Sequence, residues 1–249
     1  MAGMALTLAR RPGATMLPAD ARLFALVPAA GAGVRMGASL PKQYLTLNDR
    51  TLAEHTLGRL LACARIERVM VAVAADDPWW PALDVARQRR VSTTEGGAER
   101  AASVLNGLRA LGAWAADTDW VLVHDMARPC VRVSDIHRLI EACGEQGAIL
   151  AQPITDTVKQ AGEGGRIAAT VPRSALWRAL TPQLFPIGAL REALETGLAD
   201  GLTLTDEASA METRGWQPLL VPGRGDNIKV TVPGDLALAA FHLAQQEDA

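Results

Sequence analysis

The chain has 249 residues, of which 49% are hydrophobic and 21% are charged, a composition ordinary for a soluble globular protein. This length is enough for one large or two small domains with a substantial core. The formal net charge of −2 argues against general nucleic-acid binding. No apolar run approaches the length needed to span a membrane, so we expect neither nucleic acid nor membrane as a partner.

The cysteines and the first residues bear on cellular location. Cys63, Cys130 and Cys143 are odd in number and have no Cys-x-x-Cys spacing. We therefore expect reduced thiols in a cytoplasmic protein, not a disulfide framework or a zinc site. The apolar patch within residues 1–22 is too short for a signal peptide, and we expect a disordered tail there.

A short apolar run leads into a glycine-rich loop with two cations. Residues 23–29 predict a buried strand, and Gly31 and Gly33 follow it, with Arg35 and Lys42 close behind. Glycines let backbone N–H groups approach a phosphate, and such loops bind nucleotides at the carboxyl edge of a sheet. The spacing fits neither the dinucleotide motif nor the Walker motif. Either the two cations clamp a triphosphate, or they are solvated beside an ordinary glycine turn.

Strands and helices then alternate along the chain. We expect helices over 51–62, 99–111 and 134–143, and strands over 68–74, 91–95, 119–124 and 147–153. Ser134 is the expected N-cap of its helix. This β-α-β alternation predicts an α/β protein with a mostly parallel sheet, helices on both faces and right-handed crossovers.

The alternation breaks at residues 155–172, where two short β-prone pieces flank the glycine-rich turn at 162–165. This pattern predicts a β-hairpin with little apolar content of its own. An isolated two-stranded ribbon is marginal in water, so it must pack on something. It is either an arm that embraces a second subunit or a hairpin folded back on its own domain.

The last third returns to regular structure. We expect helices within 184–198, from Thr205 onward and over 233–246, and strands over 217–221 and 228–232. Thr205 either starts its helix or serves only as the N-cap. There is no internal repeat or flexible linker, so residues 23–249 are expected to form one domain whose β-arm covers about 153–175.

Polar residues gather at the predicted strand ends. Asp125 follows the strand that ends at His124, and its carboxylate either binds Mg²⁺ or caps a turn. Arg128 either binds phosphate or pairs with a carboxylate. Gly97 and Ser103 lie at a strand-to-helix junction, where a base or ribose can rest on backbone groups. His124 is expected to be structural.

Taken together, these segments resemble the 2-C-methyl-D-erythritol 4-phosphate cytidylyltransferase family. The matching segments, in the order the family has them, are PAAGAGVRMG, PKQY, GGAERAASV, VHDMARP, DTVK, TVPR, LTPQ, TDEASAME and GRGDNIKVT. The resemblance implies a Rossmann-like nucleotidyltransferase sheet with a protruding β-hairpin arm for dimerisation. It also implies a homodimer with arm exchange, CTP and a sugar-alcohol phosphate as substrates, and Mg²⁺ as cofactor.

The resemblance implies a role for each matching residue. The nucleotide-binding positions are Ala29, Ala30, Gly31, Gly33, Gly97 and Ser103. The catalytic positions are Arg35, Lys42, Arg173 and Lys229. The substrate-binding positions are Asp125, Arg128, Thr157, Arg173, Thr205 and Lys229, and Asp125 is also the metal position. One departure is Met126, where the family usually has alanine; we expect its larger side chain to reshape the rim of the pocket.

The function implied is transfer of CMP from CTP to 2-C-methyl-D-erythritol 4-phosphate, with release of pyrophosphate, in non-mevalonate isoprenoid biosynthesis. A cytidylyltransferase acting on ribitol 5-phosphate is an alternative, since it would share most of these motifs. A noncatalytic nucleotide sensor is a second alternative. A sensor has no need of every charge-neutralising group, whereas this sequence carries Arg35, Lys42, Asp125 and Lys229 together.

Overall fold

The computed structural model describes residues 17, 21–31 and 40–247. Gly33 and Arg35 lie outside the described residues, as do 1–16 and 18–20 of the expected tail.

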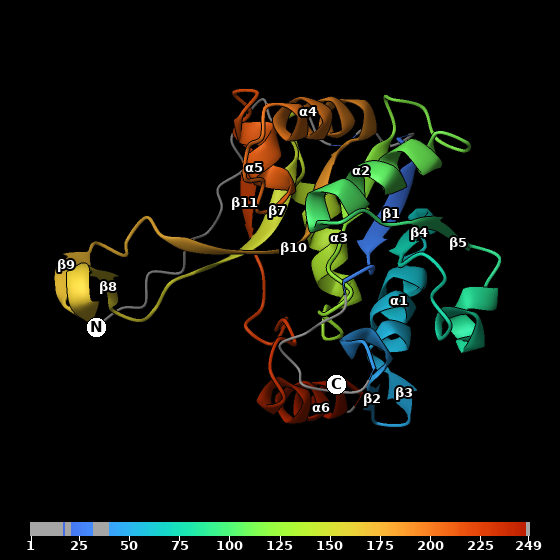
Figure 1. Cartoon of the computed structure of the whole chain (residues 1–249), viewed down its shortest axis with the longest axis horizontal. Coiled ribbons are helices and arrows are strands. Elements are labelled where there is room, and N and C mark those ends of the chain that lie inside the picture. The colour runs from blue at the N-terminus through green and yellow to red at the C-terminus, as the bar shows by residue number, and fades with distance from the viewer. Residues whose placement is uncertain (1–16, 18–20, 32–39, 248–249) are drawn as a thin grey trace.

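Seven strands form one sheet through the body of the molecule (Figure 1). The strands are β1 (Leu23–Pro28), β4 (Ile66–Val73), β5 (Val91–Glu95), β6 (Trp120–Val123), β7 (Ala148–Pro153), β10 (Trp177–Pro186) and β11 (Leu219–Pro222). Their order is β11-β7-β10-β6-β1-β4-β5. All neighbouring pairs are parallel except the two that β10 makes, with β6 and β7. The predicted α/β architecture with a mostly parallel sheet is confirmed.

The helices cover both faces of this sheet, as predicted. They are α1 (Leu52–Ala62), α2 (Arg100–Leu111), α3 (Val133–Ala142), α4 (Ile187–Ala199) and α5 (Glu207–Glu212). The last helix, α6 (Gly234–Glu247), packs instead in a third, smaller cluster that includes Leu47 and Cys130. Helices α1 and α3 contribute to one hydrophobic core, and α2, α4 and α5 contribute to the other. Thr51 begins α1 with a capping box, in which its side chain and that of Glu54 each accept a hydrogen bond from the other residue's backbone N–H.

Strand β1 explains why the sheet is covered on both sides. Leu23, Ala25 and Val27 belong to the core under α1 and α3, whereas Phe24 and Leu26 belong to the core under α2 and α4. Successive side chains of a strand point to opposite faces, so a strand buried on both faces must be apolar throughout. The loop that follows β1 therefore emerges from the centre of the molecule.

Strand β10 is an element that the sequence analysis missed. Its sequence WRALTPQLFP contains two prolines and no clear alternation of polar and apolar residues. It pairs antiparallel with β6 on one side and β7 on the other, so it is buried between two strands formed by distant parts of the chain. Tertiary pairing decides its conformation, and a local pattern does not reveal it.

Three smaller expectations were wrong. The N-cap position of α3 is Arg132, which makes no side-chain capping hydrogen bond, and Ser134 lies inside the first turn of the helix. Helix α5 is capped by Asp206, whose carboxylate accepts a hydrogen bond from the backbone N–H of Ser209, so Thr205 is not the cap. Residues 228–232 form no strand; the Val230 N–H donates to the Ala127 carbonyl, 2.8 Å away, in the loop after β6.

The predicted hairpin is confirmed as β8 (Val158–Ala161) paired antiparallel with β9 (Ile167–Val171), joined by the 3₁₀ turn η5 (Glu163–Gly165). It protrudes from the body at the left of Figure 1 and does not fold back on the sheet. Ile167 leaves 67% of its surface exposed. A second, smaller hairpin joins β2 (Thr46–Leu47) to β3 (Arg50–Thr51) in the body.

Candidate active site

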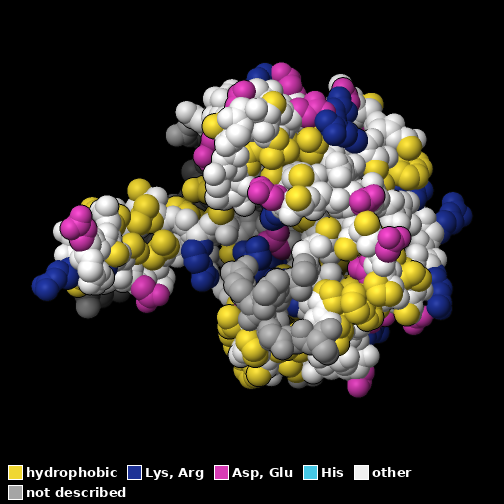
Figure 2. Space-filling view, viewed as in Figure 1, with side chains coloured by type: hydrophobic (Ala, Val, Ile, Leu, Met, Phe, Trp, Pro, Cys, Tyr) yellow, Lys and Arg dark blue, Asp and Glu magenta, His cyan; other side chains and the backbone are white. Residues whose placement is uncertain are grey.

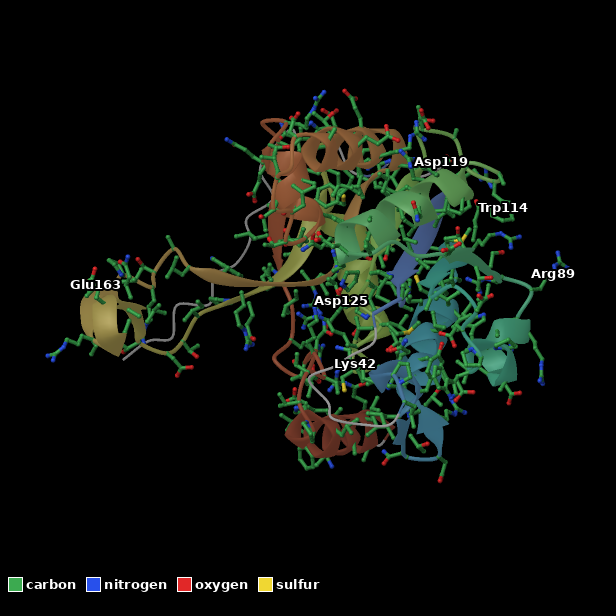
Figure 3. All side chains as sticks on the ribbon, in the orientation of Figure 1. Lys42, Arg89, Trp114, Asp119, Asp125 and Glu163 are labelled. Carbon is green, nitrogen blue, oxygen red and sulfur yellow. The ribbon has the colours of Figure 1, made fainter. Side chains whose placement is uncertain are left out.

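Two adjoining hollows lie where β1 and β6 end. Arg100, Asp125 and Lys229 line both of them. The first hollow is also lined by Lys42 and by Ala29 from the loop after β1. Strands β1 and β6 are parallel neighbours, so their carboxyl ends meet at one edge of the sheet, where α/β proteins bind ligands. Figure 3 shows Lys42 and Asp125 in this central region, and Figure 2 shows dark-blue Lys and Arg side chains gathered near the base of the arm.

The Asp125 carboxylate is surrounded by three cations. Its Oδ1 lies 2.9 Å from Arg100 Nε, and its Oδ2 lies 2.8 Å from Lys229 Nζ and 3.7 Å from Arg128 Nε. Burial acts to raise the pKa of Asp125, but the attraction of Arg100, Lys229 and Arg128 outweighs it and holds this pKa well below its usual range. Asp125 is therefore ionised at neutral pH. A turn cap, one of the two roles predicted for Asp125, does not account for these three ion pairs.

A buried hydrogen-bonded chain fixes the backbone of Asp125. Its N–H donates to Thr181 Oγ1, 3.0 Å away, and Thr181 Oγ1 lies 2.9 Å from His124 Nδ1. His124 Nε2 lies 3.1 Å from the Arg128 carbonyl, which can only accept, so we assign the proton to Nε2 and the Thr181 hydroxyl as donor to Nδ1. Burial lowers the pKa of His124 to about 4, so the ring is neutral at pH 7. The structural role expected for His124 agrees with this arrangement.

Arg100 and Glu207 are charged residues of the site that the sequence analysis did not assign. Arg100 Nη1 lies 2.7 Å from Glu207 Oε1, and Arg100 Nη2 lies 3.0 Å from Glu207 Oε2. Burial alone would lower the pKa of Arg100, but the Glu207 and Asp125 carboxylates outweigh it and raise this pKa. The sequence offered one clue to both residues: they fall inside the segments GGAERAASV and TDEASAME, which carry other site residues.

The short 3₁₀ helix η2 (Lys42–Tyr44) ties the loop after β1 to the C-terminal part of the chain. Lys42 Nζ donates to the Val230 carbonyl at 3.1 Å, which brings Lys42 beside Lys229. Gln43 is buried, and its Nε2 donates to the Ala29 carbonyl at 2.9 Å. Lys42 and Lys229, both predicted to be catalytic, thus border the same hollow.

The predicted base-binding positions lie beside the loop after β1. The Gly97 N–H donates to Ser103 Oγ at 3.0 Å, and Ser103 is buried. A Cβ atom on Gly97 would lie 2.4 Å from the Ala102 Cβ, and one on Gly96 would lie 2.4 Å from the Ala30 Cβ. Only glycine fits such approaches, and they bring the start of α2 against the loop.

The other predicted substrate-binding residues lie in two different places. Arg128 is buried, with its Nη1 donating to the Asn227 carbonyl at 2.7 Å, and it lines the second hollow together with Thr205. Thr157 and Arg173 are exposed, flank the β8–β9 hairpin in sequence and line neither hollow. The arm residues are therefore not brought together with Lys42 within one chain.

Met126 lies deeper than expected. It is 4% exposed and packs in the core that includes α1 and α3, while it also lines the first hollow. Its carbonyl accepts a hydrogen bond from Thr56 Oγ1 at 2.8 Å. The Met126 side chain therefore both packs in the core and forms part of the lining of the first hollow.

The comparisons with known proteins agree with this geometry. The family model described as 2-C-methyl-D-erythritol 4-phosphate cytidylyltransferase matches residues 23–245. The chain belongs to this family. It is 56% identical over 225 residues to the cytidylyltransferase of that name from Tolumonas auensis, covering 90% of this chain and 97% of the relative. It is 52% identical over 228 residues to that of Vibrio vulnificus, covering 91% and 96%.

Solved structures of the family share the fold. The crystal structure of the Francisella tularensis cytidylyltransferase aligns with a TM-score of 0.77 at 33% identity, covering 89% of this chain and 99% of the other. The Thermus thermophilus structure aligns with a TM-score of 0.71 at 34% identity, covering 89% and 98%.

In the part of the chain that the structure describes, no helix is both long and apolar enough to cross a membrane.

Proposed function

We propose that the chain transfers CMP from CTP to 2-C-methyl-D-erythritol 4-phosphate, giving 4-diphosphocytidyl-2-C-methyl-D-erythritol and pyrophosphate in non-mevalonate isoprenoid biosynthesis. The observation that carries this is the family match across residues 23–245. The site supports it, because three cations around one carboxylate, with Lys42 lining the same hollow, suit two phosphate-bearing substrates.

The chemistry asks mainly for positioning and charge. A phosphate monoester has a second pKa of about 6, so the acceptor is mostly dianionic at neutral pH and needs no general base. Its oxygen attacks the α-phosphorus of CTP in line with the departing pyrophosphate, and the main obstacle is repulsion between two polyanions. Lys42 and Lys229 border the hollow where this charge would gather, and fixed cations stabilise charge that develops in the transition state. Arg35, outside the described residues, is proposed to act with them.

We propose Mg²⁺ as the cofactor, with Asp125 as its protein ligand. Among the described residues, no group of three or more His, Cys, Asp and Glu side chains could hold a metal ion. Mg²⁺ is commonly bound through one or two carboxylates together with substrate phosphates and water, so a single carboxylate fits this ion. Asp125 is the acidic residue shared by both hollows, and a carboxylate has lone pairs beyond those that its cations use. When bound, Mg²⁺ neutralises charge on the nucleotide phosphates.

We propose that the chain works as a homodimer in which each arm reaches the partner's active site. The support is the protruding hairpin and the exposure of Thr157 and Arg173 away from both hollows of their own chain. A symmetric dimer would bring these residues to the neighbouring site. We also propose a cytoplasmic location, because all three cysteines are free thiols and such thiols persist in reducing compartments.

The deciding experiment measures pyrophosphate release from CTP with 2-C-methyl-D-erythritol 4-phosphate, and in parallel with ribitol 5-phosphate. Identification of the nucleotide product by mass spectrometry completes the assay. Turnover with the first acceptor, at a kcat/KM well above that with ribitol 5-phosphate, is expected. A preference for ribitol 5-phosphate identifies the pentitol-phosphate alternative, and binding of CTP without turnover of either acceptor identifies a nucleotide sensor.

A further inference from the structure

Glu207 is a buried acid that touches neither hollow. It is 1% exposed, begins α5, and is absent from the lining of both hollows, although its neighbour Asp206 lines the second. An isolated buried carboxylate is expensive to keep ionised, so such a residue is normally paired and fully hydrogen-bonded. Both Glu207 oxygens meet the Arg100 guanidinium, at 2.7 and 3.0 Å.

Arg100 also contacts Asp125. Its two terminal nitrogens are used by Glu207, and its Nε donates to Asp125 Oδ1 at 2.9 Å. The guanidinium group is planar and its donors have a fixed geometry. Fixing its outer edge with two hydrogen bonds therefore also fixes the direction of its Nε–H bond.

We infer that Glu207 is a positioning residue, which acts through the Arg100 guanidinium to set the orientation of Asp125 between the two hollows. This inference rests on the proposed function, in which Asp125 lies between nucleotide and acceptor. Asp125 is contacted by Lys229 and Arg128 as well, so Glu207 determines which of its oxygens faces which cation.

The kinetic signature follows from the charges. In a Glu207→Gln variant the amide NH₂ group faces an Arg100 N–H donor, and the two-point contact is lost. Arg100 keeps its charge and is free to turn toward the phosphates, so binding of CTP in the ground state is preserved. What is lost is the arrangement around Asp125, and misplacement by about 1 Å can cost roughly 100-fold in rate. The change should therefore fall on kcat and not on the KM for CTP.

The experiment compares kcat and KM for CTP in the wild type, Glu207→Gln, Arg100→Lys and the double variant. We expect Glu207→Gln to lower kcat by about tenfold or more with the KM for CTP within about threefold, as for an interaction that matters in the transition state. We expect no further loss when Glu207→Gln is added to Arg100→Lys, since residues that act in one chain are not additive. A wild-type kcat in Glu207→Gln, or a full additional loss in the double variant, overturns the inference.

Asp135→Asn is the matched control. Asp135 is also buried, lies in the first turn of its helix and pairs with two arginines, Arg138 and Arg224, but it lines neither hollow. This variant should lose thermal stability and keep the wild-type kcat. If kcat falls as much in Asp135→Asn as in Glu207→Gln, the loss of rate comes from general destabilisation and the inference fails.

Two further measurements keep the test decisive. If Glu207→Gln does not fold, Glu207→Asp takes its place, because it keeps the charge but withdraws the carboxylate by one methylene; unchanged kcat in folded Glu207→Asp then overturns the inference. Wild-type protein that releases no pyrophosphate from CTP and the acceptor overturns the proposed function. Active wild type with an equally active Glu207→Gln variant overturns the inference alone.

Discussion

The site and the arm are built in opposite ways. At the site, charged groups are held by partners from distant parts of the same chain, and the Asp125 side chain is 9% exposed. On the arm, Ile167 is 67% exposed and Lys159 Nζ donates to Thr170 Oγ1 across the hairpin, within the same ribbon. Figure 3 shows Asp125 in the body and Glu163 at the tip of the arm. The body specifies its own chemistry, whereas a ribbon of this kind gains stability only by packing on something.

Removing the Lys42 cation tests the body of the molecule and is the single substitution with the largest expected effect. Lys42→Ala should lower kcat by roughly 10²–10³, the scale for loss of one transition-state donor, while CTP binding falls less. Steady-state kinetics with CTP varied measures both. An unchanged kcat with a raised KM would make Lys42 a ground-state binder only.

Mixing two inactive proteins tests the arm. Lys42→Ala and Arg173→Ala homodimers should each be nearly inactive if Arg173 serves the partner's site. Unfolded together in equal amounts and refolded, they form mixed dimers in about half of all pairs, each with one intact site, so activity should recover to about a quarter of wild type. Native mass spectrometry verifies the mixed dimers. Absence of recovery despite mixed dimers would assign Arg173 to its own chain.

The buried histidine behind Asp125 should make the body acid-sensitive. Its pKa is about 4 in the folded protein against an ordinary value of 6.5, so the unfolded state binds the proton first as pH falls. The free energy of unfolding should therefore be about 3 kcal/mol lower at pH 4 than at pH 7 from this group. The Asp125 carboxyl, with a lowered pKa, adds its own loss only below about pH 4. Urea unfolding across this range measures the slope, which His124→Gln should remove; a slope that persists in that variant contradicts the assignment.

The dependence of the rate on Mg²⁺ tests the role of the Asp125 carboxylate. Chelation should abolish turnover and Mg²⁺ should restore it. Asp125→Asn should need about tenfold more Mg²⁺ for half-maximal rate, because the ligand keeps its shape and loses its charge. The titration is matched with Glu67→Gln, which removes a surface carboxylate paired with Arg22 and should leave the Mg²⁺ requirement unchanged. Full activity in excess chelator would remove the metal from the mechanism.

The smallest expected effect on stability comes from the arm. Ile167→Ser should change the free energy of unfolding of the body by no more than about 0.5 kcal/mol, because the side chain is mostly exposed. The same substitution should weaken self-association, measured by sedimentation across a range of concentrations. Unchanged association would show that this side chain takes no part in an interface.

The sequence by itself determined the parts that depend on local pattern. The apolar run of β1, the helix spacings and the glycine-rich turn of the hairpin all follow from residues close together in the chain. The free cysteines follow from the number and spacing of the cysteines. The motif segments together also placed Lys42, Asp125 and Lys229 in one site before any geometry was known, and they border one hollow.

Only the tertiary structure decided the parts that depend on distant pairing. Strand β10 is a strand because it pairs with both β6 and β7, although its own sequence lacks the pattern of one. Arg100 and Glu207 are 107 positions apart, and no local signal reveals that they meet. The physical reason is the same in both cases: the energy of a buried charge or a central strand comes from its partners, and the fold supplies those partners.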